Sequence, residues 1–341
     1  MTSGPLRHDG SLDGAAATRH LPVLAVASGA FTAQHARLVE HVKGRATLQL
    51  ADVSTPEAIA ESTGGADALV VTLQPLRAAH IAAMSPTVSV IGRAGVGLDT
   101  IDLAAAELAG ISVLNQPTYG TNEVAAHAVA MLLASQRKLG RCDRYVRDGW
   151  SGRLELAPMK PLDETTVGIV GCGRIGAATA KMLSGLVERV IVFDPAIGLT
   201  PPGTELVGDL KELLARSDAV SLHVPLTPET IGMIDAAAIA TMRRGAILVN
   251  VARGGVVDET ALAAALESGH LGGAALDVFA NEPLPADSPL LGAPNALLSP
   301  HCASYSERSS WRLPSWTIDD VISWIAERSL AHGNLAVRGT R

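Results

Sequence analysis

The stretch Val167-Gly-Ile-Val-Gly171-Cys-Gly173-Arg-Ile-Gly176 decides the fold of the second half of this chain. A short apolar segment leads directly into three glycines at the spacing GxGxxG, and a segment of helical period follows. In a strand–turn–helix unit, Gly171 permits the tight turn, Gly173 lets phosphates approach the backbone, and Gly176 lets the helix pack on the strand. Glycines also gather in turns that bind nothing, which is the competing interpretation. The flanking strand and helix favour a dinucleotide site, with the pyrophosphate at the helix N-terminus.

The next apolar segment, Val190–Phe193, ends in Asp194. In dinucleotide sites, a carboxylate at about this separation from the last glycine of the motif hydrogen-bonds the 2′-hydroxyl of a ribose. Asp194 stands at that position after Gly176. A carboxylate here would repel a 2′-phosphate, and Pro195 and Ala196 follow it where an arginine would be needed. The sequence therefore predicts NAD as the cofactor, in preference to NADP.

Short apolar runs alternate with helical segments on both sides of the glycine motif. From the motif onward, six candidate strands make up a complete doubly wound domain of Rossmann type: Val167–Val170, Val190–Phe193, Ala219–Val224, Ala246–Val251, Gly273–Val278 and Ala296–Leu298. Before the motif, four candidate strands alternate with helices such as Pro56–Ser62 and Ile101–Ala109; these strands are Val23–Ala27, Ala68–Val71, Val88–Ile91 and Ile111–Leu114. This alternation predicts an α/β protein with two parallel sheets, each covered by helices.

Two further helices are predicted to join these sheets. Asn122–Leu139 is rich in alanine and apolar over much of its surface, which predicts burial at a domain junction or against a second subunit. A polar stretch follows it through Trp150. Trp316–Leu330 has the spacing of an amphipathic helix. The chain is thus predicted to cross from the first domain to the second and to return at its end.

Composition narrows the class of protein. Of 341 residues, 48% are hydrophobic, as in ordinary globular proteins, and the net charge of −7 comes without a Lys/Arg cluster, so we expect no nucleic acid partner. Residues 1–20 predict a disordered lead-in, because they lack the apolar core of a signal peptide. No apolar run is long enough to span a bilayer, and three scattered cysteines indicate a reducing compartment. We therefore expect a cytoplasmic protein, with no membrane partner and no metal ligands.

Polar residues stand at the carboxyl ends of three later strands. The first of these strands ends at Arg253, the second is followed by Asp277 and Glu282, and the third by His301. Ligands of open α/β sheets bind at this edge. Reduction of a keto acid places negative charge on the carbonyl oxygen, so it needs a proton donor and a fixed cation. A histidine held by a carboxylate supplies the proton, and an arginine binds a substrate carboxylate through its planar fork. Each residue alone also has a structural interpretation as a turn or a cap.

With these motifs the chain resembles the D-isomer-specific 2-hydroxyacid dehydrogenase family. The resemblance rests on six segments and covers nearly all of the chain from about Leu21: Gly92-Arg-Ala-Gly-Val-Gly-Leu-Asp99, Gly171–Gly176, His223-Val-Pro-Leu-Thr, Asn250-Val-Ala-Arg253-Gly-Gly, Asp277-Val-Phe-Ala-Asn-Glu282-Pro and Pro300-His301. Among its members, the phosphoglycerate dehydrogenase and C-terminal-binding-protein branches are most similar.

The resemblance implies a Rossmann-type NAD-binding lobe inserted into a flavodoxin-like substrate lobe. The substrate domain would comprise residues 21–117 and 305–341, and the NAD-binding domain residues 118–304, including an arm at 121–150 through which a homodimer forms. His301 would be the acid/base, Glu282 its partner, and Arg253 the residue that orients the substrate. Gly95, Val96 and Gly97 would offer N–H groups to the substrate carboxylate. The cofactor would contact Gly171, Gly173, Arg174, Ile175, Gly176, Asp194, Val224, Pro225, Val251, Ala252 and Asp277, the last through the nicotinamide carboxamide.

Departures from the family pattern leave the substrate open. Thr72-Leu-Gln-Pro75 stands where phosphoglycerate dehydrogenases carry a basic residue for the substrate phosphate, although Arg77 is near. Ser304 replaces the bulky aromatic residue of the C-terminal-binding-protein branch, while Trp311 and Trp316 are expected to pack the returning tail rather than wall the site. The alternative to an enzyme is an NADH-sensing interaction protein of C-terminal-binding-protein type. The intact set of Arg253, Glu282 and His301 favours a dehydrogenase.

Overall fold

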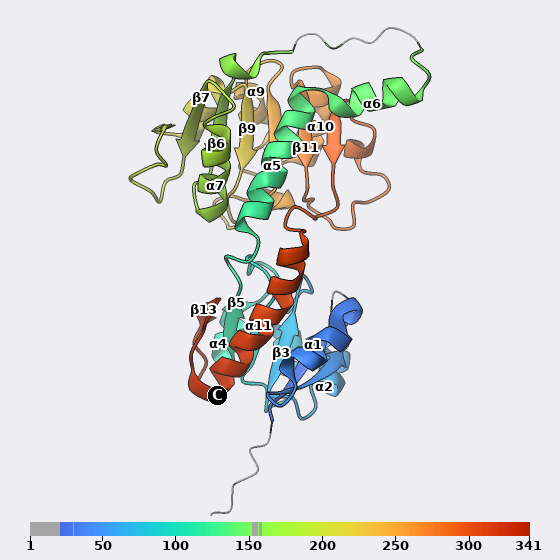
Figure 1. The fold of residues 1–341 in the computed structure, drawn as a ribbon, viewed down its shortest axis with the longest axis vertical. Helices are drawn as coiled ribbons and strands as arrows, with labels where there is room; N and C mark the ends of the chain where they lie inside the picture. The colour runs from blue at the N-terminus through green and yellow to red at the C-terminus, as the bar shows by residue number, and fades with distance from the viewer. Residues whose placement is uncertain (1–20, 30, 152–155, 157–158) are drawn as a thin grey trace, which may run out of the picture.

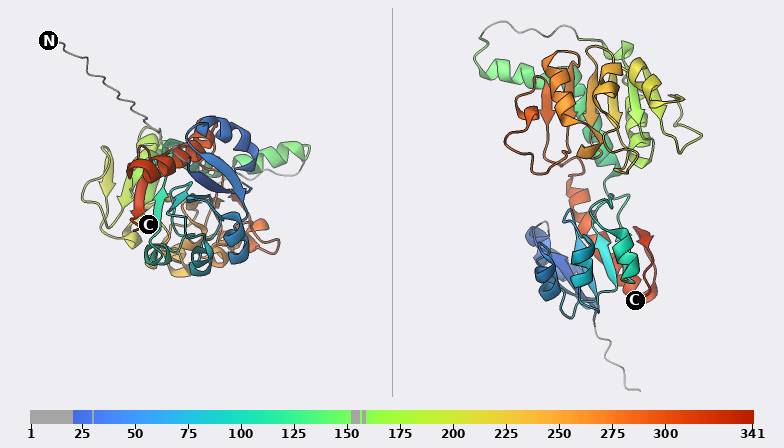
Figure 2. Two further views of the ribbon diagram at one scale, coloured as in Figure 1. Left: turned by 90° about the horizontal axis from the view of Figure 1, so that it is seen from below. Right: turned by 180° about the vertical axis from the view of Figure 1, so that it is seen from behind.

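The computed structural model describes residues 21–29, 31–151, 156 and 159–341, so the predicted lead-in lies outside the described residues. The chain forms two α/β lobes stacked end to end, each built on its own mainly parallel sheet (Figure 1). The view from behind shows the same division, with the first strands and the C-terminal segment together in one lobe (Figure 2). The prediction of two parallel-sheet lobes, one inserted into the other, is confirmed.

The lobe that contains the N-terminal strands has six strands in the order β13-β5-β4-β3-β1-β2. The order 2-1-3-4-5 of its parallel strands is that of flavodoxin-like sheets. The strands are β1 (Val23–Ala27), β2 (Thr47–Ala51), β3 (Ala68–Val71), β4 (Val90–Arg93), β5 (Ser112–Asn115) and β13 (Asn334–Val337), and β13 pairs antiparallel with β5. The helices are α1 (His35–Val42), α2 (Pro56–Ser62), α3 (Ala78–Ala83), α4 (Leu103–Leu108) and α11 (Glu307–Glu327), with a 3₁₀ turn at Thr32–Gln34.

The other lobe has seven strands in the order β12-β11-β10-β9-β6-β7-β8. Read from β8, this is the Rossmann order 3-2-1-4-5-6 with one strand added. The strands are β6 (Thr166–Val170), β7 (Arg189–Phe193), β8 (Thr204–Leu206), β9 (Ala219–Leu222), β10 (Ile247–Asn250), β11 (Gly273–Leu276) and β12 (Ala296–Leu298). The helices are α5 (Thr121–Gln136), α6 (Leu139–Arg147), α7 (Arg174–Leu183), α8 (Leu210–Arg216), α9 (Ala236–Thr241) and α10 (Glu259–Glu267), with 3₁₀ turns at Leu162–Glu164, Gly254–Val256 and Pro289–Leu291.

The central strands are apolar runs because helices cover both of their faces. Every residue of β3, β4, β5, β9, β10 and β11 is buried. Two hydrophobic clusters belong to each sheet. Helix α5 packs on β10, β11 and α7, and α11 packs on β4 and β5. The alanine-rich helix α5 therefore packs within the seven-stranded lobe, whereas the sequence predicted burial at a domain junction or against a second subunit. The chain returns through α11 to the first sheet, as predicted.

Several elements differ from the sequence prediction. Strands β2, β8 and β13 were not predicted, because each lies at or next to a sheet edge and carries too few buried residues to form an apolar run. The polar stretch before Trp150 contains helix α6, none of whose residues is buried. Helix α11 begins at Glu307, nine residues before the predicted start at Trp316, because Ser306 caps it through the N–H of Ser309.

Across the described residues, no helix combines the length and the apolar character that a membrane crossing requires. Each of the three cysteines is a free thiol.

Candidate active site

The carboxyl ends of both sheets face a single cleft of about 1030 Å³. One wall comes from the segments after β3 and β4, and the other from the segments after β6, β9, β10, β11 and β12. In both sheets this is the edge at which doubly wound folds bind ligands. Twelve of the predicted site residues line it: Gly95, Val96, Gly97, Gly173, Arg174, Ile175, Val224, Pro225, Val251, Ala252, Arg253 and Asp277. His301 lines it too, whereas Glu282 stands behind the imidazole of His301.

The glycine turn after β6 has the geometry that a dinucleotide requires. Gly171 has φ +85°, which an L side chain rarely adopts, and a β-carbon at Gly176 would lie 2.0 Å from the carbonyl oxygen of Gly171. Both glycines thus hold the turn against the helix. Gly173 instead borders open space, since a β-carbon there would meet no atom within 4 Å. Gly173 is also the N-cap of α7 and offers no capping side chain. The free N–H groups of this helix fit a pyrophosphate.

Asp194 follows β7 and lies outside the lining of the cleft. One of its carboxylate oxygens accepts the N–H of Cys172 at 2.7 Å, and the other accepts the N–H of Ala196 at 2.9 Å. These bonds fix a negative charge beside the glycine turn. Burial and then this charge raise the pKa of the Cys172 thiol. A carboxylate held here fits a ribose with a free 2′-hydroxyl better than one with a 2′-phosphate.

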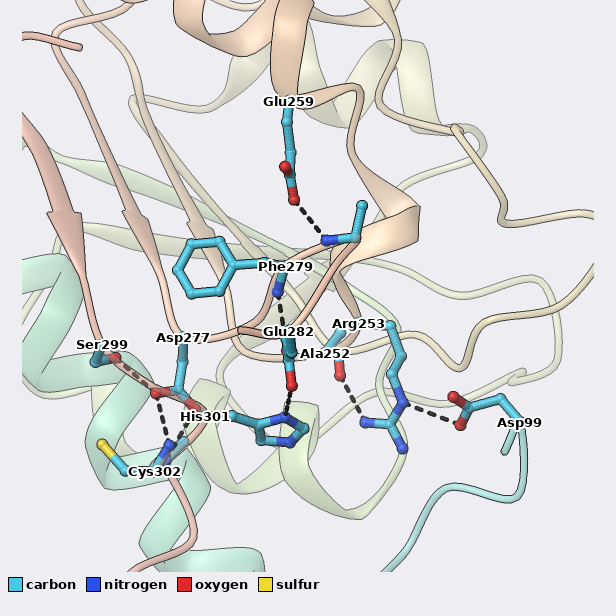
Figure 3. A network of polar contacts seen from close by, with 12 residues as sticks. Asp99, Ala252, Arg253, Glu259, Asp277, Phe279, Glu282, Ser299, His301 and Cys302 are labelled. Carbon is cyan, nitrogen blue, oxygen red and sulfur yellow. Dashed lines mark hydrogen bonds and ion pairs between the residues drawn. The ribbon is translucent and has the colours of Figure 1, made fainter. Parts of the chain in front are cut away.

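The imidazole of His301 is held by Glu282. Its Nδ1 lies 2.7 Å from Oε2 of Glu282, while Oε1 of Glu282 accepts the N–H of Phe279 at 3.0 Å (Figure 3). Burial raises the pKa of Glu282, but the hydrogen bonds from His301 and Phe279, with the positive charge of Arg253, outweigh it and leave that pKa below its ordinary value. Glu282 is therefore an anion that accepts Nδ1–H and leaves Nε2 of His301 as the exchangeable position.

The backbone of His301 adopts φ +51°, in the left-handed region. Asp277 holds this loop in place: its buried carboxylate accepts the hydroxyl of Ser299 at 2.6 Å and the N–H groups of Cys302 and Ala303 at 3.0 and 2.8 Å. The backbone carbonyl of Asp277 also accepts the N–H of His301 at 2.8 Å. A strained residue of this kind persists only where its surroundings fix it. Asp277 thus positions His301, a role that the sequence analysis did not foresee.

Arg253 reaches across the cleft to the other lobe. Its Nε donates to Oδ1 of Asp99 at 3.0 Å, and one terminal nitrogen donates to the carbonyl of Ala252 at 2.8 Å (Figure 3). The second terminal nitrogen lies against Gly97, where a β-carbon would collide with it. Asp99 ends the motif Gly92–Asp99, and its function is not evident from the sequence. It orients the guanidinium and leaves part of the planar fork for a substrate anion.

Arg93 is a residue of the cleft that the sequence analysis did not identify. Its side chain is 3% exposed, lines the cleft and donates to the carbonyl of Ala94, while its Nε has no partner. Burial and then the charge of Arg253 lower the pKa of Arg93 to about 10, so it remains a cation at neutral pH. A buried arginine with an unpaired donor needs an anion. The signal in the sequence was an arginine directly after the apolar residues of β4.

The other residues weighed from the sequence fall into two groups. Thr72, Leu73, Ser304 and Tyr305 line the cleft, whereas Arg77 is exposed outside it. Trp311 lies under Arg37, 3.7 Å from ring centre to guanidinium carbon, and Trp316 stacks on His332 at 4.5 Å. Both tryptophans pack the returning tail, as predicted.

Comparison with known proteins identifies the family of this chain. Residues 129–303 match the model of the D-isomer specific 2-hydroxyacid dehydrogenase NAD binding domain. The chain is 40% identical to a glyoxylate reductase of Korarchaeum cryptofilum, over 78% of this chain and 82% of the relative. It is 41% identical to the D-3-phosphoglycerate dehydrogenase of Mycobacterium tuberculosis, over 69% of this chain and 45% of that protein. This chain belongs to the D-isomer-specific 2-hydroxyacid dehydrogenase family. It spans about half the length of the phosphoglycerate dehydrogenases that it matches.

Solved structures give the same assignment of the fold. The D-lactate dehydrogenase of Aquifex aeolicus, complexed with NAD and lactic acid, superposes with a TM-score of 0.81 at 28% identity and covers 89% of this chain and 95% of its own. An NADPH-dependent glyoxylate/hydroxypyruvate reductase of Sinorhizobium meliloti, in complex with NADP and malonate, superposes with a TM-score of 0.83 at 28% identity, over 94% of this chain and 99% of its own. Relatives with this fold thus use either nicotinamide cofactor.

Proposed function

We propose that this protein is an NAD-dependent dehydrogenase that interconverts a small D-2-hydroxy acid and the corresponding 2-oxo acid. The observation that carries the proposal is a single cleft lined by the imidazole of His301 with its carboxylate partner, by Arg93 and Arg253, and by a glycine turn at a helix N-terminus. When bound, the nicotinamide supplies or accepts the hydride. The protein must then supply a proton, hold the substrate carboxylate and stabilise charge on the carbonyl oxygen.

His301 carries the proton in this proposal. Because Nδ1 is engaged by Glu282, Nε2 is the atom that donates a proton to the carbonyl oxygen during reduction or takes one from the hydroxyl during oxidation. The charge of Glu282 stabilises the imidazolium and holds the ring in orientation. Glu282 does not line the cleft and would act through its contact with His301, so it is a positioning residue.

The substrate carboxylate would be bound by Arg253 and by the backbone N–H groups of Gly95, Val96 and Gly97. Arg253 approaches this loop from the opposite lobe, and its bond to Asp99 keeps the guanidinium oriented. Arg93 adds a second, buried positive charge on the wall of the cleft that carries the Gly95–Gly97 loop. Arg253 has Asp99 as its ion-pair partner, whereas Nε of the buried Arg93 has no partner among the described residues, and this unpaired positive charge favours an anionic substrate.

The cofactor would lie along the other wall of the cleft. Gly173, Arg174 and Ile175 would meet the pyrophosphate, Asp194 the adenosine ribose, and Val224, Pro225, Val251 and Ala252 the remainder, with Asp277 near the carboxamide. Asp194 supports NAD over NADP because its charge is fixed by two backbone N–H groups. Comparison of kcat/KM for NADH and NADPH tests this preference, and an equal or higher value with NADPH would contradict it.

We also propose a division of the chain into a substrate domain of residues 21–117 and 305–341 and an NAD-binding domain of residues 118–304, in a cytoplasmic homodimer. Helix α6 supports the dimer, because it projects from its lobe (Figure 1). Leu139 and Val146 on this helix are exposed, and so is Trp150, which follows it. Sedimentation should give twice the monomer mass, and Leu139→Asp with Val146→Asp should give the monomer. Monomeric wild-type protein at micromolar concentration would contradict the dimer.

A direct test of function is NADH oxidation with a panel of 2-oxo acids graded in size and charge. We expect turnover with at least one member, and we expect His301→Ala to lower kcat by about 10²–10⁴-fold while NADH binding is kept. Protein that binds NADH but reduces no member of the panel would refute the dehydrogenase. Full activity in His301→Ala would remove His301 from the mechanism.

A further inference from the structure

Three potential metal ligands meet behind the loop that carries His301. They are His127 on α5, Asp277 after β11 and Cys302 after β12, and each has a donor atom within 4.8 Å of the others' donor atoms. Neither His127 nor Cys302 has a part in the proposed acid–base pair. The sulfur of Cys302 points away from the imidazole of His301 (Figure 3). The cluster is therefore a separate group of ligands that shares only Asp277 with the cofactor side of the cleft.

The spacing of these donors suits a tetrahedral ion. Nε2 of His127 lies 3.6 Å from Oδ1 of Asp277. Two donors that each bind Zn²⁺ at about 2.0–2.1 Å and subtend the tetrahedral angle of roughly 109° stand about 3.3–3.4 Å apart, within about 0.3 Å of this distance. The hydroxyl of Ser299 bridges the two side chains, 3.1 Å from Nε2 of His127 and 2.6 Å from Oδ1 of Asp277, so an ion would displace this hydrogen bond and take a water as its fourth ligand. His127 and Cys302 are only partly buried, so an ion can reach them from solvent.

We propose that His127, Asp277 and Cys302 form a binding site for a thiophilic divalent transition metal ion, with Zn²⁺ as its best occupant. Sulfur and imidazole ligands select such ions over Mg²⁺ and Ca²⁺, which prefer oxygen. On binding, the Cys302 thiol releases its proton to solvent and a sulfur–metal bond forms. Burial and then the charge of Asp277 raise the pKa of this thiol, and a bound cation would offset that charge.

Occupation of this site would act on the loop of His301. Asp277 holds that loop through Ser299, Cys302 and Ala303, and a metal on Oδ1 would compete with the first two of these bonds. The same carboxylate lines the cleft at the proposed place of the carboxamide. We therefore infer that Zn²⁺ and cofactor bind in competition, so that Zn²⁺ inhibits. The inhibition rests on the proposed function, whereas the metal site does not.

The test is titration of the full-length protein with Zn²⁺ against a chromophoric chelator, and with Co²⁺ followed by absorption. For the wild type we expect one ion per chain and a near-ultraviolet thiolate-to-cobalt band. In Cys302→Ser and in His127→Gln, the Kd for Zn²⁺ should be at least about 100-fold higher. Cys142→Ser, which removes a thiol on α6, is the matched control and should bind as the wild type does. Thermal melting of each variant establishes that it is folded.

Two results would overturn the site: a Co²⁺ spectrum without the thiolate band, or the same Zn²⁺ affinity in the wild type and both variants. Saturating NADH should weaken the apparent Zn²⁺ affinity, and an unchanged affinity would refute the competition. Metal binding is measured without any substrate, so it would stand even if no 2-oxo acid were reduced. A protein that reduces 2-oxo acids but binds no Zn²⁺ would disprove the metal site alone.

Discussion

Replacement of Glu282 by Gln separates the position of His301 from its electrostatic support. The glutamine can still accept the N–H of Phe279 through its carbonyl oxygen, so the loop after β11 should keep its conformation. Its amide NH₂ would then face Nδ1 of His301, where a carboxylate oxygen lies at 2.7 Å in the wild type. Because an amide NH₂ only donates, Nδ1 must become the acceptor. The ring then holds its single proton on Nε2, and the imidazolium loses its counter-charge.

The expected loss can be worked from that single contact. A hydrogen bond to a charged group is worth about 1.5–3 kcal/mol, and about 1.4 kcal/mol corresponds to tenfold in rate. The carboxylate is partly exposed, which favours the lower end of this range. We therefore expect kcat for 2-oxo acid reduction to fall by about 10- to 150-fold in Glu282→Gln. The KM for the 2-oxo acid should change little, because Arg253 and the Gly95–Gly97 loop are untouched.

The assay is steady-state NADH oxidation from pH 5.5 to 9, with NADH binding and thermal melting as controls for the fold. Loss of the counter-charge should lower kcat while the Kd of NADH and the melting temperature stay near their wild-type values, because the loop after β11 keeps its contact with Phe279. A purely structural role would instead weaken NADH binding or lower the melting temperature. A kcat within twofold of the wild type would refute the assigned role of Glu282.

Three further predictions concern the glycine turn before α7, the buried carboxylate of Asp320 on α11 and the stability that Glu282 contributes. Gly173→Val should leave the melting temperature unchanged, because the added side chain enters open space at the N-terminus of α7. It should weaken NADH binding at least about tenfold, because that space is where the pyrophosphate would lie. Tight NADH binding in this variant would contradict the cofactor site. Asp320→Ala should lower the free energy of unfolding by roughly 3–5 kcal/mol in urea titrations, since the buried carboxylate accepts three backbone N–H groups, from residues 331–333, and the amide of Gln116; a loss under 1 kcal/mol would count against this. The charge of Glu282 should contribute its full stabilisation above the unfolded pKa of about 4.3, and this stabilisation should be lost as pH falls through the lowered pKa of the folded state. The melting temperatures of the wild type and Glu282→Gln should therefore converge towards about pH 3. A difference in melting temperature that stays constant with pH would contradict this.

The parallel βα alternation explains why much of the site could be predicted from sequence. Carboxyl ends of parallel strands share one edge, so residues that follow β10, β11 and β12 come together whatever the details of the loops. Arg253, Glu282 and His301 follow those strands, and the structure brings the first and last to one cleft with Glu282 bonded to His301. The glycine motif predicted the strand, turn and helix after β6, on the same wall of the cleft, in the same way.

What the sequence did not reveal depends on contacts between distant segments. The bond between Arg253 and Asp99 joins residues 154 positions apart and in different lobes, and no local pattern encodes it. Arg93 follows an apolar run and resembles the end of a buried strand, although its guanidinium reaches the cleft. Edge strands such as β13 are invisible for a related reason: their pairing partner, and not an apolar run, decides that they form.

Asp277 shows how this interdependence limits the interpretation of mutants. One buried carboxylate anchors the loop of His301, lines the cofactor side of the cleft and stands among the proposed metal ligands. Loss of turnover in Asp277→Ala would therefore not identify a contact with the carboxamide, because His301 would be released as well. The two effects differ in their kinetics: a released His301 lowers kcat at saturating NADH, whereas a lost cofactor contact raises the Kd of NADH in the absence of substrate. Only the second result would assign Asp277 to the cofactor.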